Sequence, residues 1–508
     1  MNPSDASELR TTQRSRREFL KALGIGVAWP DRLFGEEANH RGVLVNDIQT
    51  ESNPTYVSSV VSVHTAEDLA REIEGAHRKS LRVSTCGARH ASGGQEFGSQ
   101  TILLDTRSLN RVLSFDQDNG TLEVEGGTMW PDLMSFYLKA QQNRPQQWGI
   151  VQKQGGLDRL TMGGTLSANA HGHTLTRKPI VGDIESFELI NASGNAIRCS
   201  RSLNPELFGL AIGGYGLFGV ISRVKLRLIR RQRLVRRVHW DETENLAESF
   251  EKYTAQGALY GDFQYSIDSQ SKDFIRRGIL TAYLPADSQG KPGQDAPELS
   301  EANLAELLYL AHTNKAEAFQ DYARASLKGD GEIVWSDTHQ YSPYPRYYHH
   351  VIDQRTHAAH PGTDTLAEVY VPRGRLADFL DEARAALKAW KTNVVYGTVR
   401  FIRRDDETFL PWAREDYACV IFTIHVTRDA DGLAQALNTF HNLTHFALLR
   451  GGSFYMTYQR FADRKQIESC YPRFADFLVL KQKYDPTGVF DSDWYRHNKQ
   501  LFSEAVNS

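Results

Sequence analysis

The sequence predicts an α+β fold that is divided into more than one domain. The chain has 508 residues, which is more than one hydrophobic core normally organises. Its first half alternates short strands and hairpin signals with a few helices, for example Asp118-Asn119-Gly120 between two strand-like runs. Its second half mixes helical stripes with strands again. This order favours an α+β arrangement over a doubly wound parallel sheet.

In the first half, a helix is expected to start at Thr65, with Leu69, Ile73 and Ala76 as its apolar stripe. A second helix should begin near Pro131, because proline is tolerated in the first helical turn. Apolar or alternating runs predict strands at 81–85, 102–105, 111–115, 121–125, 184–190, 196–199 and 220–228.

In the second half, helical periodicity recurs at 301–327, 374–390 and 432–449. Strands are expected at 365–371, 394–401 and 418–426, and residues 287–297, rich in Gly, Pro and Gln, are expected to form a loop. The arginine-rich run 230–237 marks a change of composition. We interpret it as a solvated edge at a domain border.

Bulk composition excludes several classes of protein. Apolar residues make up 40% of the chain and charged residues 24%, which is typical of globular proteins. The formal net charge is −3, so no nucleic-acid partner is expected. No apolar run approaches the roughly 20 residues of a transmembrane helix, and none is expected. The four cysteines are too widely spaced for a zinc motif or a redox pair.

The N-terminus carries an export-like motif. Residues 15–21, Ser-Arg-Arg-Glu-Phe-Leu-Lys, resemble the bacterial twin-arginine signal, and a modest apolar stretch follows them. We therefore treat residues 1–37 as a signal segment and expect a periplasmic or extracellular protein.

Three segments rich in glycine and other small residues are the strongest chemical signal. They are residues 82–94, 155–172 and 213–221. Glycine lets a ligand approach the backbone closely, and a turn that exposes several N–H groups can cradle a phosphate. So much Gly, Ser, Thr and Ala in 155–172 argues against a packed helix there. None of the three fits the Rossmann fingerprint or the Walker loop.

The order of these segments resembles the FAD-binding domain of the vanillyl-alcohol oxidase and p-cresol methylhydroxylase (PCMH) family. That family has a G-x-x-H-S loop, a G-T-V-G-G-like loop ending in H-G, and then G-x-G-x-x-G-V-I. The resemblance covers about residues 55–232, and it implies FAD as the cofactor, held in a two-lobed domain. In many members the histidine of the first loop bonds covalently to the flavin, and His90 matches it. Ala91 replaces the usual serine.

The loops and the resemblance together assign fifteen residues to the cofactor. These residues are Gly87, Ala88, Arg89, His90, Ala91, Ser92, Asp158, Gly163, Gly164, Ser167, Asn169, His171, Gly172, Gly219 and Ile221. A second covalent bond, which some relatives make through a cysteine of the second loop, is not expected, because Gln154 and Gly155 stand there.

The C-terminal part resembles the sugar-oxidising branch of the family, which includes the aldonolactone oxidases and decaprenylphosphoryl-ribose oxidase. Gly451-Gly452-Ser453-Phe454-Tyr455 and the run 485–493, Asp-Pro-Thr-Gly-Val-Phe-Asp-Ser-Asp, carry this resemblance. It implies an FAD-binding domain at 38–232, a sheet-and-helix substrate cap at 233–450 and a tail at 451–508 that returns to the FAD-binding domain.

The same resemblance points to substrate-side residues. Glu368, Arg400 and Tyr458 occupy catalytic positions, and Tyr370 and Cys419 belong to the substrate pocket. Thr398 and Tyr458 replace a Glu and a Lys of these relatives, so the catalytic base stays open between Glu368 and Tyr458. The expected reaction is hydride transfer from a CH–OH group of a small carbohydrate-like alcohol or lactone to the flavin. The electron acceptor, oxygen or another molecule, also stays open; Ala170, bulkier than glycine, slightly favours a dehydrogenase.

Two other functions are compatible with the sequence. A noncatalytic flavin- or sugar-binding protein would need a degenerate cap pocket. A metal-dependent hydrolase could be built on His441 and His445, which are four residues apart on a predicted helix. The sequence shows no third ligand for them, so no metal ligand is assigned.

Overall fold

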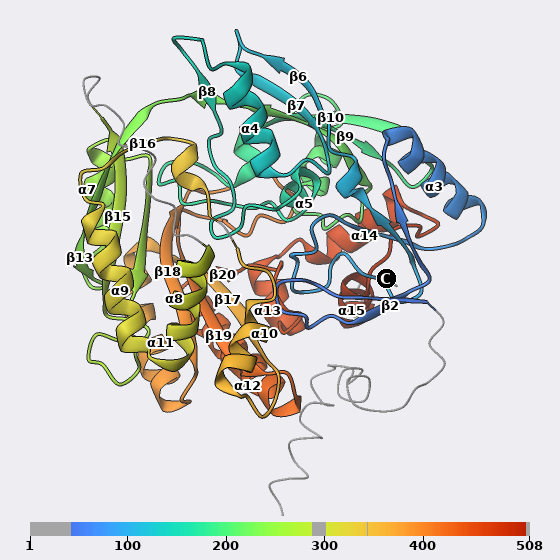
Figure 1. The fold of residues 1–508 in the computed structure, drawn as a ribbon. Coiled ribbons are helices and arrows are strands. Elements are labelled where there is room, and N and C mark those ends of the chain that lie inside the picture. Colours follow the sequence, from blue (N-terminus) through green and yellow to red (C-terminus); the bar gives the residue numbers. More distant parts are fainter. Residues whose placement is uncertain (1–41, 287–300, 343, 504–508) are drawn as a thin grey trace, which may run out of the picture.

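The computed structural model describes residues 42–286, 301–342 and 344–503. It has two lobes, one from the first half of the chain and one from residue 233 onward, and the last helices return to the first lobe (Figure 1). Helices and antiparallel sheets occur in both lobes, which confirms the α+β prediction. The export-like motif at 15–21 and the predicted loop at 287–297 lie outside the described residues.

The first lobe contains a small parallel sheet and a larger antiparallel sheet. The parallel sheet has the order β3-β5-β4, and the antiparallel sheet has the order β10-β9-β11-β7-β6. The strands of the lobe are β1 (Val43–Val45), β2 (Thr55–Val57), β3 (Ser59–Ser62), β4 (Val83–Cys86), β5 (Ile102–Asp105), β6 (Val112–Asp116), β7 (Thr121–Glu125), β8 (Trp148–Gly149), β9 (Ile184–Ile190), β10 (Ala196–Ser200), β11 (Val220–Arg227) and β12 (Ile229–Arg230). Its helices are α3 (Ala66–Arg78), α4 (Trp130–Ala140), α5 (Met162–Ser167) and α6 (Pro205–Ala211), with 3-10 turns at Thr106–Ser108 and Ile180–Asp183.

Local sequence explains where these elements begin. The Thr65 hydroxyl caps α3 by accepting a hydrogen bond from the Asp68 N–H, and Leu69, Ile73 and Ala76 are buried as predicted. Proline occupies the first turn of α4. The expected hairpins form, because β6 pairs with β7 and β9 pairs with β10, both antiparallel.

The second lobe is built on one eight-stranded sheet of order β16-β13-β15-β14-β18-β19-β17-β20. Its strands are β13 (Arg233–Glu242), β14 (Tyr260–Tyr265), β15 (Arg277–Pro285), β16 (Ile333–Trp335), β17 (Gly362–Pro372), β18 (Val394–Ile402), β19 (Tyr417–Thr427) and β20 (Ser453–Phe454). Its helices are α7 (Leu246–Ala255), α8 (Glu301–Thr313), α9 (Lys315–Lys328), α10 (Tyr348–Thr356), α11 (Leu376–Ala389) and α12 (Ala430–Leu448), with 3-10 turns at Thr338–Gln340 and Arg373–Arg375.

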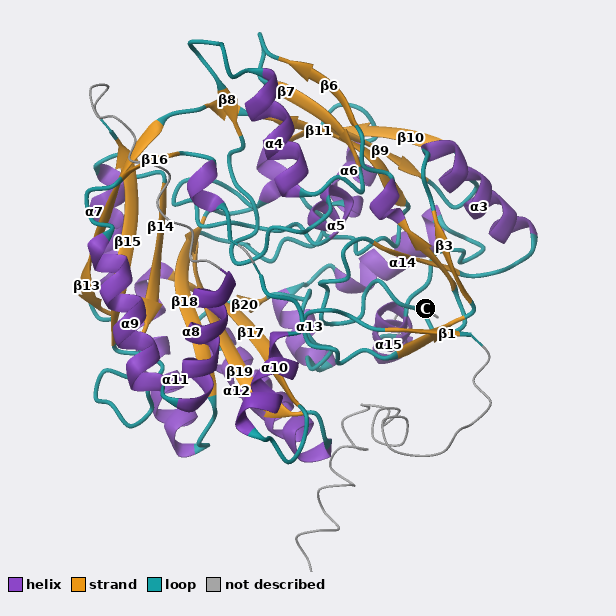
Figure 2. Ribbon diagram, in the orientation of Figure 1, coloured by secondary structure: helices purple, strands orange, loops and turns teal. Residues whose placement is uncertain are grey.

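Helices lie on both faces of this sheet (Figure 2). Successive side chains of a strand point to opposite faces. Phe422, opposite Ala367 in the ladder, packs against Phe379 of α11, whereas Asp364 of β17 contacts α8 through His312. The face that carries Asp364, Glu368 and Tyr370 is therefore covered by α8 at one end, and it meets the first lobe at the other.

The tail holds the two lobes together. It contains α13 (Arg464–Cys470), α14 (Phe474–Tyr484) and α15 (Asp493–Leu501). The Val83 N–H donates to the Val489 carbonyl at 2.7 Å, and the Asp491 N–H donates to the Val83 carbonyl at 2.9 Å. The tail therefore pairs in parallel with β4, the strand that leads into the first glycine-rich loop.

Three expectations are wrong in detail. The run 155–172 does contain a short helix, α5, because the Thr161 hydroxyl caps it. The stripe at 301–327 is two helices, α8 and α9, and Asn314 caps the second. Arg231 is not part of a solvated edge: its side chain is 10% exposed and pairs at 2.8 Å with the fully buried Asp337. That pair anchors the border between the lobes.

No helix among the described residues is long and apolar enough to cross a membrane.

Candidate functional site

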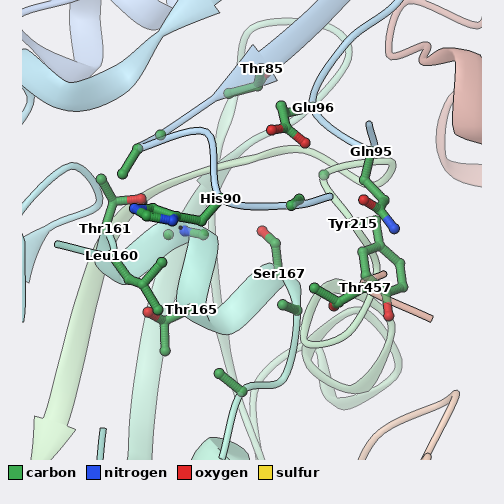
Figure 3. A pocket seen from close by; sticks show the side chains of 18 of the residues that line it. Thr85, His90, Gln95, Glu96, Leu160, Thr161, Thr165, Ser167, Tyr215 and Thr457 are labelled. Carbon is green, nitrogen blue, oxygen red and sulfur yellow. Dashed lines mark hydrogen bonds between the residues drawn. The ribbon is translucent and has the colours of Figure 1, made fainter. Parts of the chain in front are cut away.

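A cavity of about 1100 Å³ of empty space lies between the three glycine-rich segments and the tail. Figure 3 shows Gln95, Tyr215 and Thr457 on one side of it and Leu160 and Thr161 on the other. The lining residues are Thr85, Gly87, Ala88, Arg89, His90, Ala91, Gln95, Glu96, Thr106, Gln154, Leu157, Leu160, Thr161, Gly163, Gly164, Thr165, Ser167, Ala168, Ala170, Tyr215, Gly216, Gly219, Val220, Ile221, Tyr455, Thr457 and Tyr458. The lining combines apolar side chains with a few polar groups and exposed backbone, as cofactor sites do.

Close backbone packing explains the small residues of the first two loops. A Cβ atom at Gly87 would lie 2.1 Å from the Thr161 hydroxyl oxygen, so the first loop can approach the second only with glycine there. Gly163 is also closely packed, although less so: its Cβ would be 3.2 Å from the Gly126 carbonyl oxygen. The two loops therefore form a continuous backbone wall.

Residues with a left-handed backbone conformation form turns elsewhere in the cavity lining. Arg89 has a φ of 63°, and the pair Tyr215 and Gly216 has φ values of 51° and 76°. Such turns present successive N–H groups to one side, which is how backbone binds phosphate oxygens.

Several buried polar atoms of the lining lack a hydrogen-bond partner among the described residues. They are Arg89 Nε, Gln95 Oε1, both carboxyl oxygens of Glu96, Thr165 Oγ1 and Thr457 Oγ1. Buried polar groups in folded proteins are almost always paired. A polar ligand along this wall would supply the partners, and FAD, with its phosphates, ribityl hydroxyls and ring heteroatoms, fits. Burial also raises the pKa of Glu96 well above its ordinary value, which favours the neutral carboxyl form that can donate a hydrogen bond.

His90 lies in the cavity wall with its ring partly buried. Its Nδ1 lies 3.3 Å from Gln49 Oε1, and its ring makes an edge contact with Tyr344 at 5.8 Å between centroids. Burial, with a smaller effect of Arg346, lowers the pKa of His90 to about 4. The imidazole is therefore neutral at pH 7, the form that has a nucleophilic lone pair.

Glu368 is the centre of a polar cluster on the cap sheet and is fully buried. Its Oε2 accepts a hydrogen bond from the Tyr458 hydroxyl at 2.9 Å. Its Oε1 lies 2.7 Å from His171 Nε2 and also accepts from the Tyr370 hydroxyl and, at 3.4 Å, the Cys419 thiol. Because Tyr458 lines the cavity, Glu368 reaches the cavity through that hydroxyl.

The neighbours of Glu368 determine its charge. Burial alone would raise the pKa of Glu368, but His171 and the hydrogen bonds from His171 and Tyr370 hold it below the ordinary value of 4.5. Burial raises the pKa of Tyr458 well above 10. The pair is therefore a carboxylate that accepts from a neutral phenol.

Arg400 lies on the same sheet face, two strands away. Its ladder neighbour on β19 is Cys419, which in turn is opposite Tyr370 on β17. The Arg400 side chain is buried, and its Nε and Nη1 have no hydrogen-bond partner among the described residues. No ion pair joins it to Glu368 in that part of the chain. The buried guanidinium interacts with Tyr396 and Asp262, and its Nε and Nη1 remain donors for a ligand group.

The structure places the predicted residues in two groups. Ten of the fifteen cofactor candidates line the cavity: Gly87, Ala88, Arg89, His90, Ala91, Gly163, Gly164, Ser167, Gly219 and Ile221. Of the substrate-side candidates, Glu368, Tyr370, Cys419 and Tyr458 come together. Arg400 is opposite Cys419 in the ladder, but its guanidinium faces Gly155, where a Cβ would lie 2.7 Å from it.

The remaining five cofactor candidates lie outside the cavity lining. Ser92 is buried behind the first loop, and Asp158 pairs with Lys153 at 2.7 Å. Asn169, with a φ of 46°, turns the chain and binds Asp405 at 2.9 Å. After this turn His171 meets Glu368, and the Gly172 N–H donates to Gln152. These residues therefore support either the backbone of the glycine-rich loops or the polar cluster around Glu368.

Sequence reasoning did not assign several lining residues to the site, and five of them carry polar or aromatic side chains at informative places. Gln95 and Glu96 directly follow the first loop, Tyr215 interrupts the third, and Tyr455 and Thr457 belong to the tail. Two of these residues could have been found from the sequence: Glu96 is a charged residue beside a glycine-rich loop, and Tyr215 is an aromatic residue within one. Nothing in the sequence reveals that Glu96 is buried without a partner.

The structure gives no support to the hydrolase alternative. His441 Nε2 contacts the Phe461 carbonyl oxygen. Among the described residues, neither His441 nor His445 belongs to a group of three side chains that could share a metal ion.

Comparison with known families agrees with this geometry. Residues 57–200 match the family model described as "FAD binding domain", and residues 365–498 match the model described as "D-arabinono-1,4-lactone oxidase". The first match contains the first two loops, and the second contains Glu368, Arg400, Cys419 and Tyr458.

Similar curated proteins are plant enzymes. The chain is 25% identical to cytokinin dehydrogenase 2 of Arabidopsis thaliana over 46% of its own length and 45% of the relative. It is 28% identical to cytokinin dehydrogenase 4 of Oryza sativa subsp. japonica, over 44% of the chain and 42% of the relative. The chain thus spans less than half the length of the curated relatives it matches.

The cavity and the two matched regions thus describe a chain whose residues 57–200 are similar to an FAD-binding domain and whose residues 365–498 are similar to D-arabinono-1,4-lactone oxidase.

Proposed function

We propose that this protein oxidises a CH–OH group of a small carbohydrate-like alcohol or lactone. The observation that carries the proposal is the buried, charged Glu368 that reaches the flavin cavity through the Tyr458 hydroxyl. Both residues fall within the region similar to D-arabinono-1,4-lactone oxidase. When bound, the flavin accepts a hydride from the substrate carbon.

Glu368 serves as the base, and Tyr458 conducts the proton. A substrate hydroxyl would donate its proton to the Tyr458 oxygen while the phenolic proton moves to Glu368 Oε2, 2.9 Å away. His171, at 2.7 Å from the other carboxyl oxygen, fixes the orientation of Glu368. Water is kept from this cluster because Glu368, Tyr370 and Cys419 are fully buried.

Arg400 orients the substrate. Its unpaired Nε and Nη1 are donors for the ring oxygen, carbonyl or hydroxyl groups of a carbohydrate or lactone. A guanidinium also stabilises negative charge that develops on an oxygen during oxidation. A degenerate pocket in a noncatalytic binding protein would not need a buried carboxylate and a buried guanidinium on one face.

His90 forms a covalent bond to the flavin methyl carbon. The neutral imidazole in the cavity wall supports this assignment. Such a C–N bond would replace one hydrogen on the methyl carbon and the proton on the imidazole nitrogen, and an electron acceptor would take the two electrons released.

The twin-arginine-like motif at 15–21 supports export of the protein to the periplasm or the medium. Ala170 lines the cavity, and a side chain bulkier than glycine there favours an acceptor other than oxygen.

Anaerobic flavin reduction tests the proposed substrate class. The purified flavoprotein is mixed with D-arabinono-1,4-lactone, with a panel of alditols and other aldonolactones, and with a cytokinin. Loss of the visible flavin absorbance with at least one carbohydrate-like compound is expected. Reduction by the cytokinin alone would overturn the proposal. Reoxidation by oxygen and by an artificial dye then distinguishes an oxidase from a dehydrogenase.

A further inference from the structure

A second polar cluster lies on the cap sheet away from the flavin cavity. Asp364 of β17 lies between His312 of α8 and His425 of β19. Its Oδ1 is 3.2 Å from His312 Nε2 and 2.8 Å from His425 Nδ1. The three donor atoms lie within 4.8 Å of one another. The His312 and Asp364 side chains are 4% and 2% exposed, so bulk water does not solvate them.

The hydrogen bonds of His312 require a proton or a metal ion between its Nε2 and the Asp364 carboxylate. Its Nδ1 lies 2.7 Å from the Leu308 carbonyl oxygen, which can only accept, so Nδ1 carries a hydrogen. In a neutral ring Nε2 then holds a lone pair, and this lone pair faces a carboxylate oxygen. Two acceptors cannot stay in contact unless a second proton or a metal ion lies between them.

The surroundings resemble those of a metal site. Histidines that bind a metal usually donate their other N–H to a carbonyl, and carboxylate ligands are themselves hydrogen-bonded. His312 donates to Leu308, and the Tyr348 hydroxyl donates to Asp364 Oδ2. Two ligands about 2.05 Å from a tetrahedral zinc ion lie about 3.3 Å apart. The observed 2.8 and 3.2 Å therefore need to widen by only a few tenths of an ångström.

We propose that His312 Nε2, the Asp364 carboxylate and His425 Nδ1 bind one divalent transition-metal ion of the zinc class. Two imidazoles favour zinc and its neighbours over magnesium or calcium, which prefer oxygen ligands. Water or the second oxygen of Asp364 completes the coordination.

The proposed ion has a structural role. It joins α8 to β17 and β19, which places one end of the α8–α9 hairpin on the sheet. Tyr348, bonded to Asp364, makes an edge contact with Tyr344 at 5.8 Å, and Tyr344 makes one with His90, also at 5.8 Å. The metal thus fixes the segment that lies over the histidine of the flavin loop.

Two other groups on the described residues are less suited to a metal. Glu51 faces His349 and His350, but Arg428 already pairs with the same carboxyl oxygen at 2.7 Å. Glu368 faces His171 and Cys419, and two tyrosine hydroxyls already occupy its oxygens. Lys315 interacts electrostatically with Asp364, and burial lowers the pKa of this lysine to about 8.

Zinc titration of the full-length flavoprotein tests the site. The protein is treated with a chelator, desalted and titrated with Zn²⁺, and the bound metal is measured by plasma mass spectrometry. The wild type should bind one zinc ion per chain, and its Tm should rise with free Zn²⁺, because the ion binds the folded state. His425→Ala, at the most exposed ligand, and Asp364→Asn should bind at least about tenfold more weakly.

The matched control is His350→Ala, which removes a histidine from the Glu51 group and should leave binding unchanged. Circular dichroism and flavin content verify that each variant is folded; if Asp364→Asn does not fold, His425→Ala decides. The proposal is overturned if the wild type takes up no zinc, or if folded His425→Ala binds zinc as tightly as the wild type does. Loss of binding in His350→Ala alone would also overturn it, because the ion would then lie at Glu51.

Discussion

The hydrogen bond between Tyr458 and Glu368 allows a sharp test of the proposed chemistry. Tyr458→Phe removes one hydroxyl and keeps the ring. A hydrogen bond to a charged group contributes about 1.5–3 kcal/mol. If this contribution is realised in the transition state, flavin reduction by substrate should slow by about tenfold to a hundredfold, since each 1.36 kcal/mol is a factor of ten.

Tyr455→Phe is the matched control. Tyr455 lines the same cavity and packs against Tyr458 at 5.6 Å between ring centroids, but its hydroxyl donates to the Ala168 carbonyl at 2.8 Å. Its loss should destabilise the fold slightly and leave the chemical step within about threefold of wild type.

The assay is stopped-flow flavin reduction under anaerobic conditions, with the best substrate from the panel above. Flavin content and Tm are measured for both variants, so that a folding defect is not mistaken for a chemical one. The reasoning is refuted if Tyr458→Phe reduces its flavin as fast as wild type. Equal losses in both variants would also refute it, because packing of the rings would then explain the effect.

Four further predictions follow from the site. Acid precipitation should leave the flavin on the wild-type chain but release it from His90→Ala, as fluorescence of a denaturing gel would show; free flavin from the wild type contradicts the covalent bond. Because the pKa of Glu368 is held below 4.5, the rate of flavin reduction should not fall as pH decreases from 8 until the pH is below that value, and a loss of rate near pH 6 would count against this base. Gly155→Ala should displace the Arg400 guanidinium and weaken substrate turnover with flavin content unchanged; wild-type turnover would show that Arg400 acts elsewhere. Lysine at both positions of the arginine pair 16–17 should keep the protein inside the cytoplasmic membrane, measured by cell fractionation, and unchanged export would exclude the proposed signal.

The sequence predicted those helices and hairpins whose ends are marked by local capping or turn residues. The cap of α3 at Thr65 and the Asp118-Asn119-Gly120 hairpin are examples, because each depends on side chains a few residues apart. The split of 301–327 into two helices was missed, because Asn314 reads equally well as a polar residue inside one helix. The buried position of Arg231 depends on Asp337, more than 100 residues away, and no local pattern reports it.

The candidate site divides in the same way. The glycine-rich loops could be recognised from the sequence, because positions such as Gly87 have no space for a side chain and must be glycine. His171 and Glu368 are 197 residues apart in the chain. The sequence therefore suggested a role for each residue but not the contact between them. His171 was assigned to the cofactor from its loop alone; after the turn at Asn169 it contacts Glu368 and is not among the cavity-lining residues.

The contact between the two ends of the chain has a consequence for biogenesis. Arg82, at the base of the first flavin loop, donates to a carbonyl 405 residues later, and the neighbouring Val83 pairs with the same segment. A ribosome must therefore release nearly the whole polypeptide before that loop acquires its final support. The first flavin loop is therefore completed only after the segment at 487–491 has been synthesised. Export of the unfolded chain would separate the apoprotein from FAD before the loop is completed. Export of the folded protein would allow FAD to bind first.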